Sequence, residues 1–510
     1  MGRGGTWAVA CVAMLAFSCS GQAPSTSPST VLDTHPGNPG DGGSTPPDAG
    51  SGPDGGYTPP NPPPPKENTF LGYADGLLEK PIVGFSQDPS GTLWVATRQA
   101  LYMRQPGARS FRRFTTNDGL HLNGNPVIYC NVAPIITDPT ACPVPGQATP
   151  QGITDIEAGE PNQVFVGYFG QDPVDLGVDW NDPDRHSGKL DIATFTPDPS
   201  RPNTNAGTLS VHRVDLAVSG HGGQYWHNRT VLRLLYDRVH HPGELYLGTN
   251  HGVDRIQVAK VRDVQAYEYF NSVYAEFLSD HIHPRVCYHM ACIDYVEGAG
   301  QRMGEWRGLA FNTDGNLWVA GRWAAGLAIW TPVLSDWSSR PGAATYVIAF
   351  GDPYVYQSYA DAPGYIEEPV FRPPLEGDPV ALSSVAVATD GSAWFTSEAY
   401  VPGDVSYGVA KWDGHRFTPF DPVRDLGMAE QPVREVVALP DGTLVFSAPN
   451  TGLTFYDPVK KTSARYAAAQ GGVPDDYIFR VNLTQDTSGD PVLLVATYSG
   501  AAILRTWPKP

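Results

Sequence analysis

Basic residues are scarce in this sequence. It has 34 Lys and Arg against 53 Asp and Glu, so its formal net charge is −19. Proteins that bind nucleic acid without regard to base sequence neutralise phosphates with Lys and Arg. The charge balance therefore argues against nucleic acid as a partner. It favours an acidic, soluble surface that resists association, and we expect a monomer.

Complete catalytic motifs are absent as well. The sequence contains no G-x-S-x-G nucleophile motif, no Walker phosphate-binding loop and no dinucleotide-binding glycine pattern. Their absence excludes the enzyme classes that depend on these motifs. We expect no cofactor, and the one alternative, a calcium ion, is considered below.

The first eighteen residues have the pattern of a secretion signal. Arg3 supplies a positive start, and Thr6 to Phe17 forms a mostly apolar segment of about 12 residues, too short to span a bilayer. The segment ending at Cys19 (LAFSC) resembles a bacterial lipobox, although Ala16 stands where the pattern prefers Leu. The resemblance implies lipid modification of Cys19, which would anchor the chain stably. A plain signal peptide cut by the ordinary signal peptidase is the alternative.

Residues 20–66 are rich in Pro, Gly and Ser and carry no periodic apolar pattern. Such a segment has too little to bury and is expected to be a disordered tether. We therefore expect a signal peptide at 1–18, a tether at 19–66 and a folded domain at 67–510. The resemblance at Cys19 implies a bacterial cell-envelope protein that meets the membrane through its lipid anchor only. Ser20 favours the outer membrane, on either its periplasmic face or the cell surface.

Cysteine is also scarce, since only four of the six cysteines lie beyond the leader. An even number in an exported chain predicts disulfides. Pairing by nearest neighbour gives Cys130–Cys142 and Cys287–Cys292. Neither spacing is C-x-x-C, so neither a zinc knuckle nor a redox motif is expected.

A turn-and-strand motif recurs through the rest of the chain. A small polar turn with Gly precedes an apolar strand, and a second Gly precedes a second strand. Examples are DPSGTLWVAT (88–97), TDGNLWVAGRWAAGLAIW (313–330) and PDGTLVFSAPNTGLTFY (440–456). Repeats of this size that cannot each bury a face alone are typical of a β-propeller. The DG and PG turns supply the positive φ that hairpins require.

We count seven repeat units, of which the last lacks its outermost strand. TFLGYADGL (69–77) matches the last strand of the first unit, RRFTTNDGL (112–120). We therefore predict an all-β, seven-bladed β-propeller whose N-terminal strand completes the last blade and leaves no open edge in the ring.

The alternation within the strands supports blades packed on both sides. Leu93, Val95 and Thr97 face one side, and Trp94 and Ala96 the other. Small residues recur at the position of Ala96 and are expected where blades crowd near the axis; they include Gly248, Ala320 and Ala496.

The repeat consensus allows a resemblance to be named. A strand, D-x-x-G-x-L-W-[VI]-[AG]-T, GL-x-x-[YW] and a strand ending in DGL together resemble the two-component-regulator propeller repeat over residues 69–507, apart from insertions. The resemblance implies a propeller like those in the periplasmic sensor halves of hybrid histidine kinases or in free-standing exported proteins. No transmembrane helix, kinase or DNA-binding module follows the repeats, so we expect any signalling role to need a separate partner.

Four segments interrupt the repeats: 123–151, 168–206, 271–304 and 331–380. They are rich in Tyr, Trp, Asp and Pro. Long insertions are often functional, and aromatic rings and carboxylates on loops suit contacts with carbohydrate, peptide or protein. The alternative is that they only cover one face of the ring.

Acidic residues crowd the second of these segments, at Asp172, Asp175, Asp179 and Asp182. Dense oxygen ligands suit Ca²⁺, but the spacing does not match an EF-hand loop. Solvated acidic turns are the favoured interpretation, and a calcium site is the alternative.

Histidines cluster between residues 212 and 251. Histidine is a common metal ligand and general base, and streptogramin lyases are propellers that use His with a divalent metal near the channel. His221 and His227 precede a predicted innermost strand, so they lie near the channel mouth. No spacing typical of a three-His metal site supports this enzyme, and loop packing is the favoured interpretation. If the protein is an enzyme, the residues to test are His221, His227, His251 and Glu305.

Arginines also lie in or beside predicted strands, at Arg98, Arg233, Arg307, Arg322 and Arg434. Some are placed to line the channel and bind an anion, but pairing with acidic neighbours is the favoured interpretation.

Three functions remain open. We favour a cell-envelope binding or interaction module, sensory or otherwise, whose partner is an unidentified envelope protein or glycan. The alternatives are a propeller hydrolase or lyase acting at the central channel, and a structural scaffold of the envelope.

Overall fold

The chain divides into two units, Met1–Pro63 and Pro64–Pro510, and the computed structural model describes residues of the second. The longer described ranges are 67–120, 148–169, 189–215, 231–249, 253–259, 306–321, 382–398, 408–414, 417–430, 432–486 and 488–510. Short strands are described at 127–130, 135–136, 217–218, 226–227, 279–282, 286–288, 291–293, 325–329 and 345–348.

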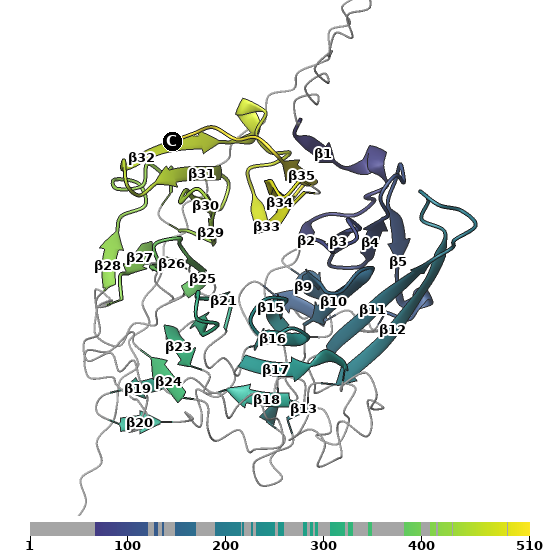
Figure 1. Cartoon of the computed structure of the whole chain (residues 1–510), viewed down its shortest axis with the longest axis horizontal. Helices are drawn as coiled ribbons and strands as arrows, with labels where there is room; N and C mark the ends of the chain where they lie inside the picture. The colour runs from purple at the N-terminus through teal and green to yellow at the C-terminus, as the bar shows by residue number, and fades with distance from the viewer. Residues whose placement is uncertain are drawn as a thin grey trace, which may run out of the picture. The chain divides into compact units, whose positions relative to one another are not determined.

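The described residues of this unit include seven four-stranded antiparallel sheets arranged around an axis (Figure 1). From the axis outward they are β2 (Ile82–Gln87), β3 (Leu93–Thr97), β4 (Leu101–Arg104) and β5 (Arg112–Phe114); β9 (Ile153–Ala158), β10 (Gln163–Tyr168), β11 (Lys189–Pro197) and β12 (Gly207–Asp215); β15 (Val231–Asp237), β16 (Glu244–Thr249), β17 (Val253–Gln257) and β18 (Ser279–Ile282); β21 (Gly308–Phe311), β22 (Leu317–Ala320), β23 (Ala325–Ile329) and β24 (Thr345–Ile348); β25 (Leu382–Val387), β26 (Ala393–Ser397), β27 (Val409–Trp412) and β28 (Phe417–Phe420); β29 (Glu435–Ala438), β30 (Leu444–Ala448), β31 (Gly452–Asp457) and β32 (Thr462–Tyr466); and β33 (Ile478–Gln485), β34 (Pro491–Thr497), β35 (Ala501–Leu504) and β1 (Thr69–Leu71).

The innermost strands form a closed ring. β2, β9, β15, β21, β25, β29 and β33 contact one another in that order, and β33 in turn contacts β2. The N-terminal strand β1 pairs with β35, with Thr69 opposite Ile503, and so completes the last sheet. The predicted all-β propeller, with its last sheet completed by the N-terminal strand, is confirmed.

Asn68 fixes this closure from just outside β1. Its amide Nδ2 donates to the Thr506 carbonyl at 2.8 Å, and its Oδ1 accepts from the backbone N–H groups of Arg505 at 2.8 Å and Thr506 at 3.0 Å. One side chain therefore ties the start of the domain to its end, so that neither edge of the last sheet is left to fray.

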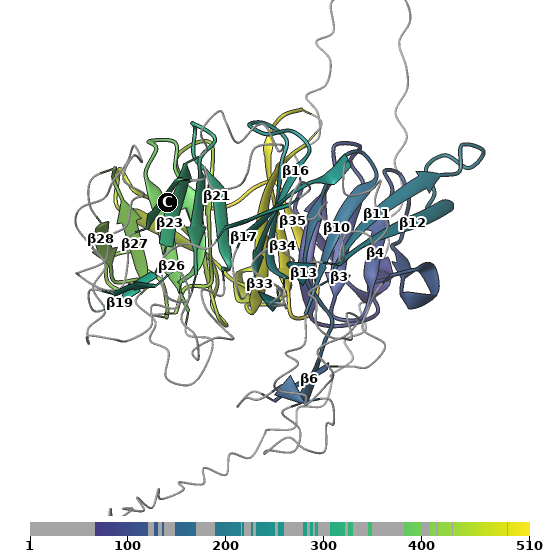
Figure 2. The same ribbon diagram turned by 90° about the horizontal axis from the view of Figure 1, so that it is seen from below.

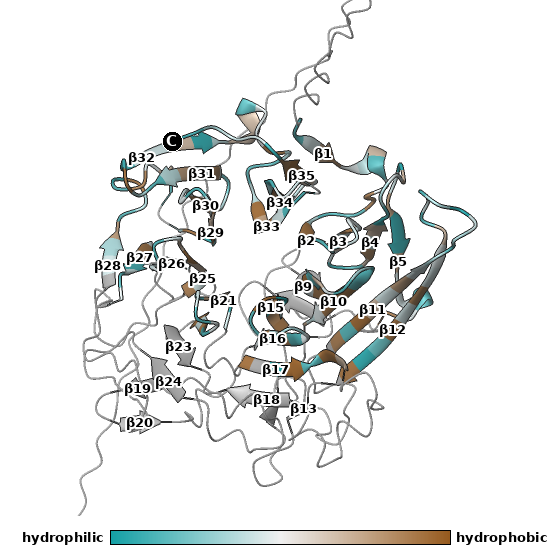
Figure 3. Cartoon of the chain, viewed as in Figure 1, coloured by the Kyte–Doolittle hydropathy of each residue, from teal (hydrophilic) through white to brown (hydrophobic). Residues whose placement is uncertain are grey.

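Each sheet is apolar on both sides because it is packed between two neighbours. Trp94 and Ala96 lie in one buried cluster, whereas Leu93 and Val95 lie in another on the opposite side of the same sheet. This is the alternation predicted from the sequence. In Figure 3 brown residues gather on inner strands such as β25 and β29, and teal residues on the outer strand β5.

The turns between first and second strands carry residues in the left-handed region, as predicted. Gly91 has a φ of 85° and Asn162 a φ of 59°. A side chain other than Gly or Asn would be strained there, which explains the recurring small polar turn of the repeat.

The predicted insertions were too wide, because three of them contain strands of the regular sheets. β11 lies within 168–206, β18 within 271–304 and β24 within 331–380. The outermost strand of the third sheet is β18, so the prediction of VQAYEYF (264–270) as that strand was wrong; those residues lie outside the described part of the chain. Segment 123–151 contains a small separate sheet of β6 (Val127–Cys130), β7 (Ile135–Ile136) and β8 (Ala148–Gln151).

The ring has two faces that differ in what attaches to them. Figure 2 shows strands such as β33 and β21 running from one face to the other. We call the face at which the innermost strands begin the strand-start face, and the other the strand-end face. Second strands end and third strands begin at the strand-start face, as the pairing of Ile82 with Thr97 shows.

Most interruptions of the repeats are connected at the strand-start face. The described strands that flank the following segments end and begin there: 137–147, 170–188, 294–305, 349–381 and 399–407. Segments 260–278 and 330–344 instead join third to fourth strands, at the strand-end face. No helix among the described residues is long and apolar enough to cross a membrane.

Candidate functional site

The innermost strands carry charged residues at one equivalent position. In each sheet this position lies opposite a small residue of the second strand, as with Arg233 opposite Gly248 and Arg480 opposite Ala496. Going round the ring, the seven residues are Gly84, Asp155, Arg233, Gly308, Ser384, Glu435 and Arg480. We call them the charged tier. Their small partners include Ala96, Gly248, Ala320 and Ala496, as the sequence predicted.

Ion pairs within the charged tier join sheets that are not neighbours. Arg233 forms a bidentate pair with Glu435, with both N–O distances 3.0 Å, across the two sheets that begin with β21 and β25. The side chains are only 9% and 7% exposed. Arg480 donates to Asp155 Oδ2 at 3.2 Å and lies 3.5 Å from Glu435 Oε1. The tier therefore braces the ring across its axis.

Burial dominates the acid–base properties of this tier. It raises the pKa of Asp155 to about 7, although Arg233 and the Leu234 and Ile156 backbone N–H groups oppose the rise. It also raises the pKa of Glu435 despite the pair with Arg233. Removing the carboxylates from water costs more than their partners return, which is common for buried ion pairs.

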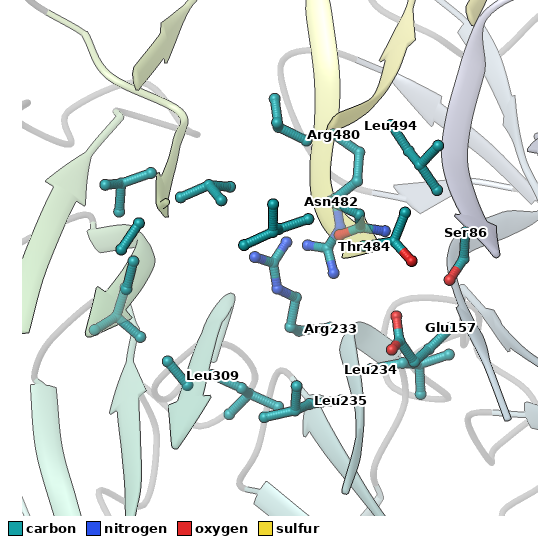
Figure 4. Close-up of a pocket in the computed structure, with 18 of the residues that line it drawn as sticks. Ser86, Glu157, Arg233, Leu234, Leu235, Leu309, Arg480, Asn482, Thr484 and Leu494 are labelled. Atoms are coloured by element: carbon teal, nitrogen blue, oxygen red, sulfur yellow. The ribbon is translucent and has the colours of Figure 1, made fainter. Parts of the chain in front are cut away.

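A cavity of about 350 Å³ extends from the charged tier towards the strand-end face (Figure 4). The guanidinium groups of Arg233 and Arg480 lie at its inner end. One side is polar and comes from the adjacent strands β2, β9 and β33; its residues are Ser86, Gln87, Glu157, Asn482 and Thr484. The other side is apolar and comes from β15, β21, β25 and β29; it includes Leu235, Leu309, Phe311, Val385, Val387 and Val437.

Glu157 is the carboxyl that distinguishes the polar side. Figure 4 shows it on the same side of the cavity as Ser86. Among the described residues no hydrogen bond reaches its carboxyl group. Burial raises its pKa to about 8; the charge of Arg238 lowers it and that of Asp155 raises it. The group is therefore mostly protonated at neutral pH.

Arginines gather on the other side of the charged tier, at the strand-start face. Arg434, just before β29, pairs with Glu398 at 2.6 and 2.7 Å and donates to the Tyr477 hydroxyl at 3.1 Å. Its guanidinium lies over the Tyr477 ring, 4.7 Å from the centroid. Arg307 precedes β21, and Arg98 lies in the turn between β3 and β4. We call Arg98, Arg307 and Arg434 the arginine cluster.

Arg98 is the member of this cluster that lacks a counter-charge. No hydrogen bond or ion pair joins its partly buried guanidinium to another group in the part of the chain that the structure describes. Burial lowers its pKa to about 10, and the charges of Arg307 and Arg434 add to the effect. Nearby in the ring, Thr154 Oγ1 is buried without a hydrogen-bond partner among the described residues. The cluster thus carries more positive charge than Glu398 offsets.

The residues predicted for catalysis fall mostly outside the described chain. His221, His251 and Glu305 lie outside it, and His227 is described only as part of strand β14 (Trp226–His227). All four belong to connections at the strand-start face, near the predicted channel mouth. Among the described residues there is no group of three or more His, Cys, Asp or Glu that could hold a metal ion.

The remaining predicted sites are likewise only partly described. Cys19, Cys142 and Arg322 lie outside the described residues, as do the calcium candidates Asp172, Asp175, Asp179 and Asp182. Cys130 belongs to β6. Cys287 in β19 (Val286–Tyr288) is paired in register with Cys292 in β20 (Ala291–Ile293). Both disulfides stay predictions.

Sequence reasoning placed Arg233 near the channel but missed Asp155, Glu157, Glu435 and Arg480. A signal was present: each is a charged residue inside an otherwise apolar innermost strand, as in VREVVAL (433–439) and IFRVNL (478–483). Charges are depleted in strands packed on both faces, so their presence indicates that these positions face the channel.

Comparisons with known proteins give no family and no close relative. No family model matches the sequence, and no curated protein matches it. Virginiamycin B lyase from Staphylococcus aureus is 8% identical, with 86% of this chain and 99% of that chain covered at a TM-score of 0.43. YCF48 from Cyanidioschyzon merolae is 9% identical, with 84% and 96% covered at 0.40. The extracellular domain of the hybrid two component system BT4673 from B. thetaiotaomicron is 14% identical, with 82% and 52% covered at 0.25. At these identities the likeness concerns the fold alone.

Proposed function

We propose that this propeller is a binding module whose partner presents an acidic group to the arginine cluster at the strand-start face. The observation that carries the proposal is the Arg98 guanidinium, which has no ion pair or hydrogen bond among the described residues although Arg307 and Arg434 lie close enough to lower its pKa. Guanidinium groups match carboxylate and phosphate oxygens in geometry and charge. An anion bound here would supply the missing counter-charge.

The rest of the channel supports a site at its mouth. The ion pairs of the charged tier cross the axis directly beneath the arginine cluster. A ligand at the strand-start face therefore meets a polar floor, and the connections that interrupt the repeats surround it. Loops on a rigid ring are a common arrangement for recognition. The partner is an envelope protein or glycan with an exposed acidic group.

The proposed binding can be tested with citrate as the probe. Citrate should raise the melting temperature of the full chain more than sodium chloride of equal ionic strength, because a ligand of the folded state alone stabilises it. Replacing Arg98 with Gln should weaken citrate binding by tenfold or more, since a hydrogen bond to a charged group contributes about 1.5–3 kcal/mol. Differential scanning fluorimetry over a citrate series measures both effects.

Arg201→Gln is the matched control, because Arg201 is a surface residue with a side chain 67% exposed that pairs with Asp198. It should respond to citrate like the wild type. The Arg98→Gln protein should fold at least as stably as the wild type in the absence of citrate, since the change removes a repelling charge. An equal citrate response in the wild type and Arg98→Gln would contradict the proposal.

We also propose that the protein acts as a lipoprotein of the outer membrane, anchored through Cys19. The support is the lipobox-like segment LAFSC and the Pro- and Gly-rich tether that follows it. Replacing Cys19 with Ala in a bacterial host should leave the protein unprocessed or soluble and abolish labelling by a palmitate analogue. Fractionation with the outer membrane that is unchanged by Cys19→Ala would rule out the anchor.

A further inference from the structure

We propose that the cavity on the strand-end side of the charged tier is a second binding site, which takes a small molecule with a cationic nitrogen at one end and an apolar body. This site is separate from the arginine cluster because the ion pairs of the charged tier lie between them. Four features carry the inference: the volume of the cavity, its two-sided lining, its charge balance and its free acceptor atoms.

The volume suits a small organic molecule. A cavity of about 350 Å³ lies at the lower end of the range of ligand pockets, which is roughly 300–1,000 Å³. The apolar side, on β15, β21, β25 and β29, offers Leu309, Phe311 and Val385 to an alkyl chain or ring. The polar side offers hydrogen-bonding groups on three adjacent strands. A molecule with one polar end and one apolar flank fits both.

The charge balance selects the sign of the polar end. Arg233 and Arg480 at the inner end of the cavity are each engaged with buried carboxylates of the charged tier. Arg238 at the cavity wall donates to the backbone carbonyls of Ala158 and Gly159, and it is exposed to solvent. Glu157 is the one cavity carboxyl among the described residues without a hydrogen-bond partner. An added cation would complete its pairing, whereas an added anion would meet cations that already have partners.

The acceptor atoms suit an ammonium group, which has three N–H donors and no acceptor. Asn482 donates its Nδ2 to the Phe85 carbonyl at 2.8 Å, which leaves its Oδ1 as an acceptor. The Ser86 hydroxyl oxygen already accepts from the Ala158 N–H at 3.0 Å but retains a second lone pair. Together with the Glu157 carboxylate, these oxygens offer three acceptors from three adjacent strands.

Binding must then be coupled to a proton. In the empty cavity Glu157 is held mostly neutral by burial. When an alkylammonium ion binds, the carboxyl O–H bond breaks, the proton leaves to solvent, and the resulting carboxylate pairs with the ammonium. The charged groups that act on Glu157 are Arg238, Asp155 and Arg233, and none of them is removed by binding. We therefore expect the release of close to one proton per ligand at pH 7 and little release above pH 9.

Isothermal titration with 2-phenylethylamine and its neutral counterpart 2-phenylethanol tests this proposal on the full chain. The amine should bind the wild type at least tenfold more tightly than the alcohol. Titrations at pH 7 in phosphate and in Tris, which differ in ionisation enthalpy, should report the released proton. Replacing Glu157 with Gln should weaken amine binding at least tenfold and abolish the proton release.

Glu67→Gln serves as the control, because Glu67 is exposed and lies outside the cavity. It should bind the amine like the wild type. The proposal is overturned if the amine shows no saturable binding, if the alcohol binds as tightly, or if Glu157→Gln binds the amine with unchanged affinity. The citrate response of Arg98 is measured on the same samples, so failure of one site is told apart from failure of the other.

Discussion

Replacing Arg233 with Met should lower the free energy of unfolding by about 3–5 kcal/mol. The substitution keeps an apolar stem of similar length but leaves the Glu435 carboxylate, only 7% exposed, without its bidentate partner. Arg480, at 3.5 Å, is the nearest remaining cation and already serves Asp155. A carboxylate stranded in this way must either stay charged at high cost or take up a proton. Urea denaturation followed by tryptophan fluorescence measures the loss.

A double variant separates the pair from its surroundings. Replacing both Arg233 and Glu435 with Met removes the pair and leaves neither charge stranded, so most of the lost stability should return. Arg424→Met is the matched surface control, because Arg424 is 75% exposed in its pair with Asp425; it should cost less than about 1 kcal/mol. A loss below 1 kcal/mol for Arg233→Met would show that the cross-axis pair contributes little to the ring.

The charged tier explains how one ring can hold two separate sites. Sheets in a propeller contact only their neighbours, and here the innermost strands contact one another in a closed order. The pairs Arg233–Glu435 and Arg480–Asp155 add links between sheets that do not touch in that order. They also fill the channel at one level. The arginine cluster and the Glu157 cavity therefore lie on opposite sides of a polar partition, and each has its own chemistry.

The fold was predictable because its causes are local and repeated. The positive φ at Gly91 and the apolar alternation around Trp94 recur in each unit, and TFLGYADGL repeats the end of the first unit. Strands β11 and β24 were assigned to insertions because the segments between them and the preceding strands break the repeat spacing.

The cavity was not predictable for a different reason. Arg233 and Glu435 are 202 positions apart, and Arg480 and Asp155 are 325 apart. A single sequence shows that each is a charge in an apolar strand, but their pairing depends on which sheets face each other across the axis. Glu157 is recognisable only once these pairs are known, because its significance lies in having no such partner.

The stability of the protein should fall as the pH rises from about 4.5 to about 8, and Glu157→Gln should remove a large part of that fall. The unfolded chain loses the Glu157 proton near the ordinary pKa of 4.5, whereas the folded chain holds it to about 8. Between these values the unfolded state binds fewer protons, so the free energy of unfolding decreases with pH. The raised pKa of Asp155, at about 7, acts in the same direction.

The size and sign of the effect can both be measured. At pH 5 both side chains are neutral in the folded protein, and Glu157→Gln should differ from the wild type by about 0.5 kcal/mol or less. At pH 8.5 the variant should be the more stable, by on the order of 2–4 kcal/mol once screening in the open cavity is allowed for. Urea denaturation at half-unit pH intervals, with Glu67→Gln in parallel, gives the two curves. If the curves of Glu157→Gln and the wild type stay parallel between pH 5 and 8.5, Glu157 is ionised in the folded protein throughout this range, and the cavity would then hold a permanent negative charge.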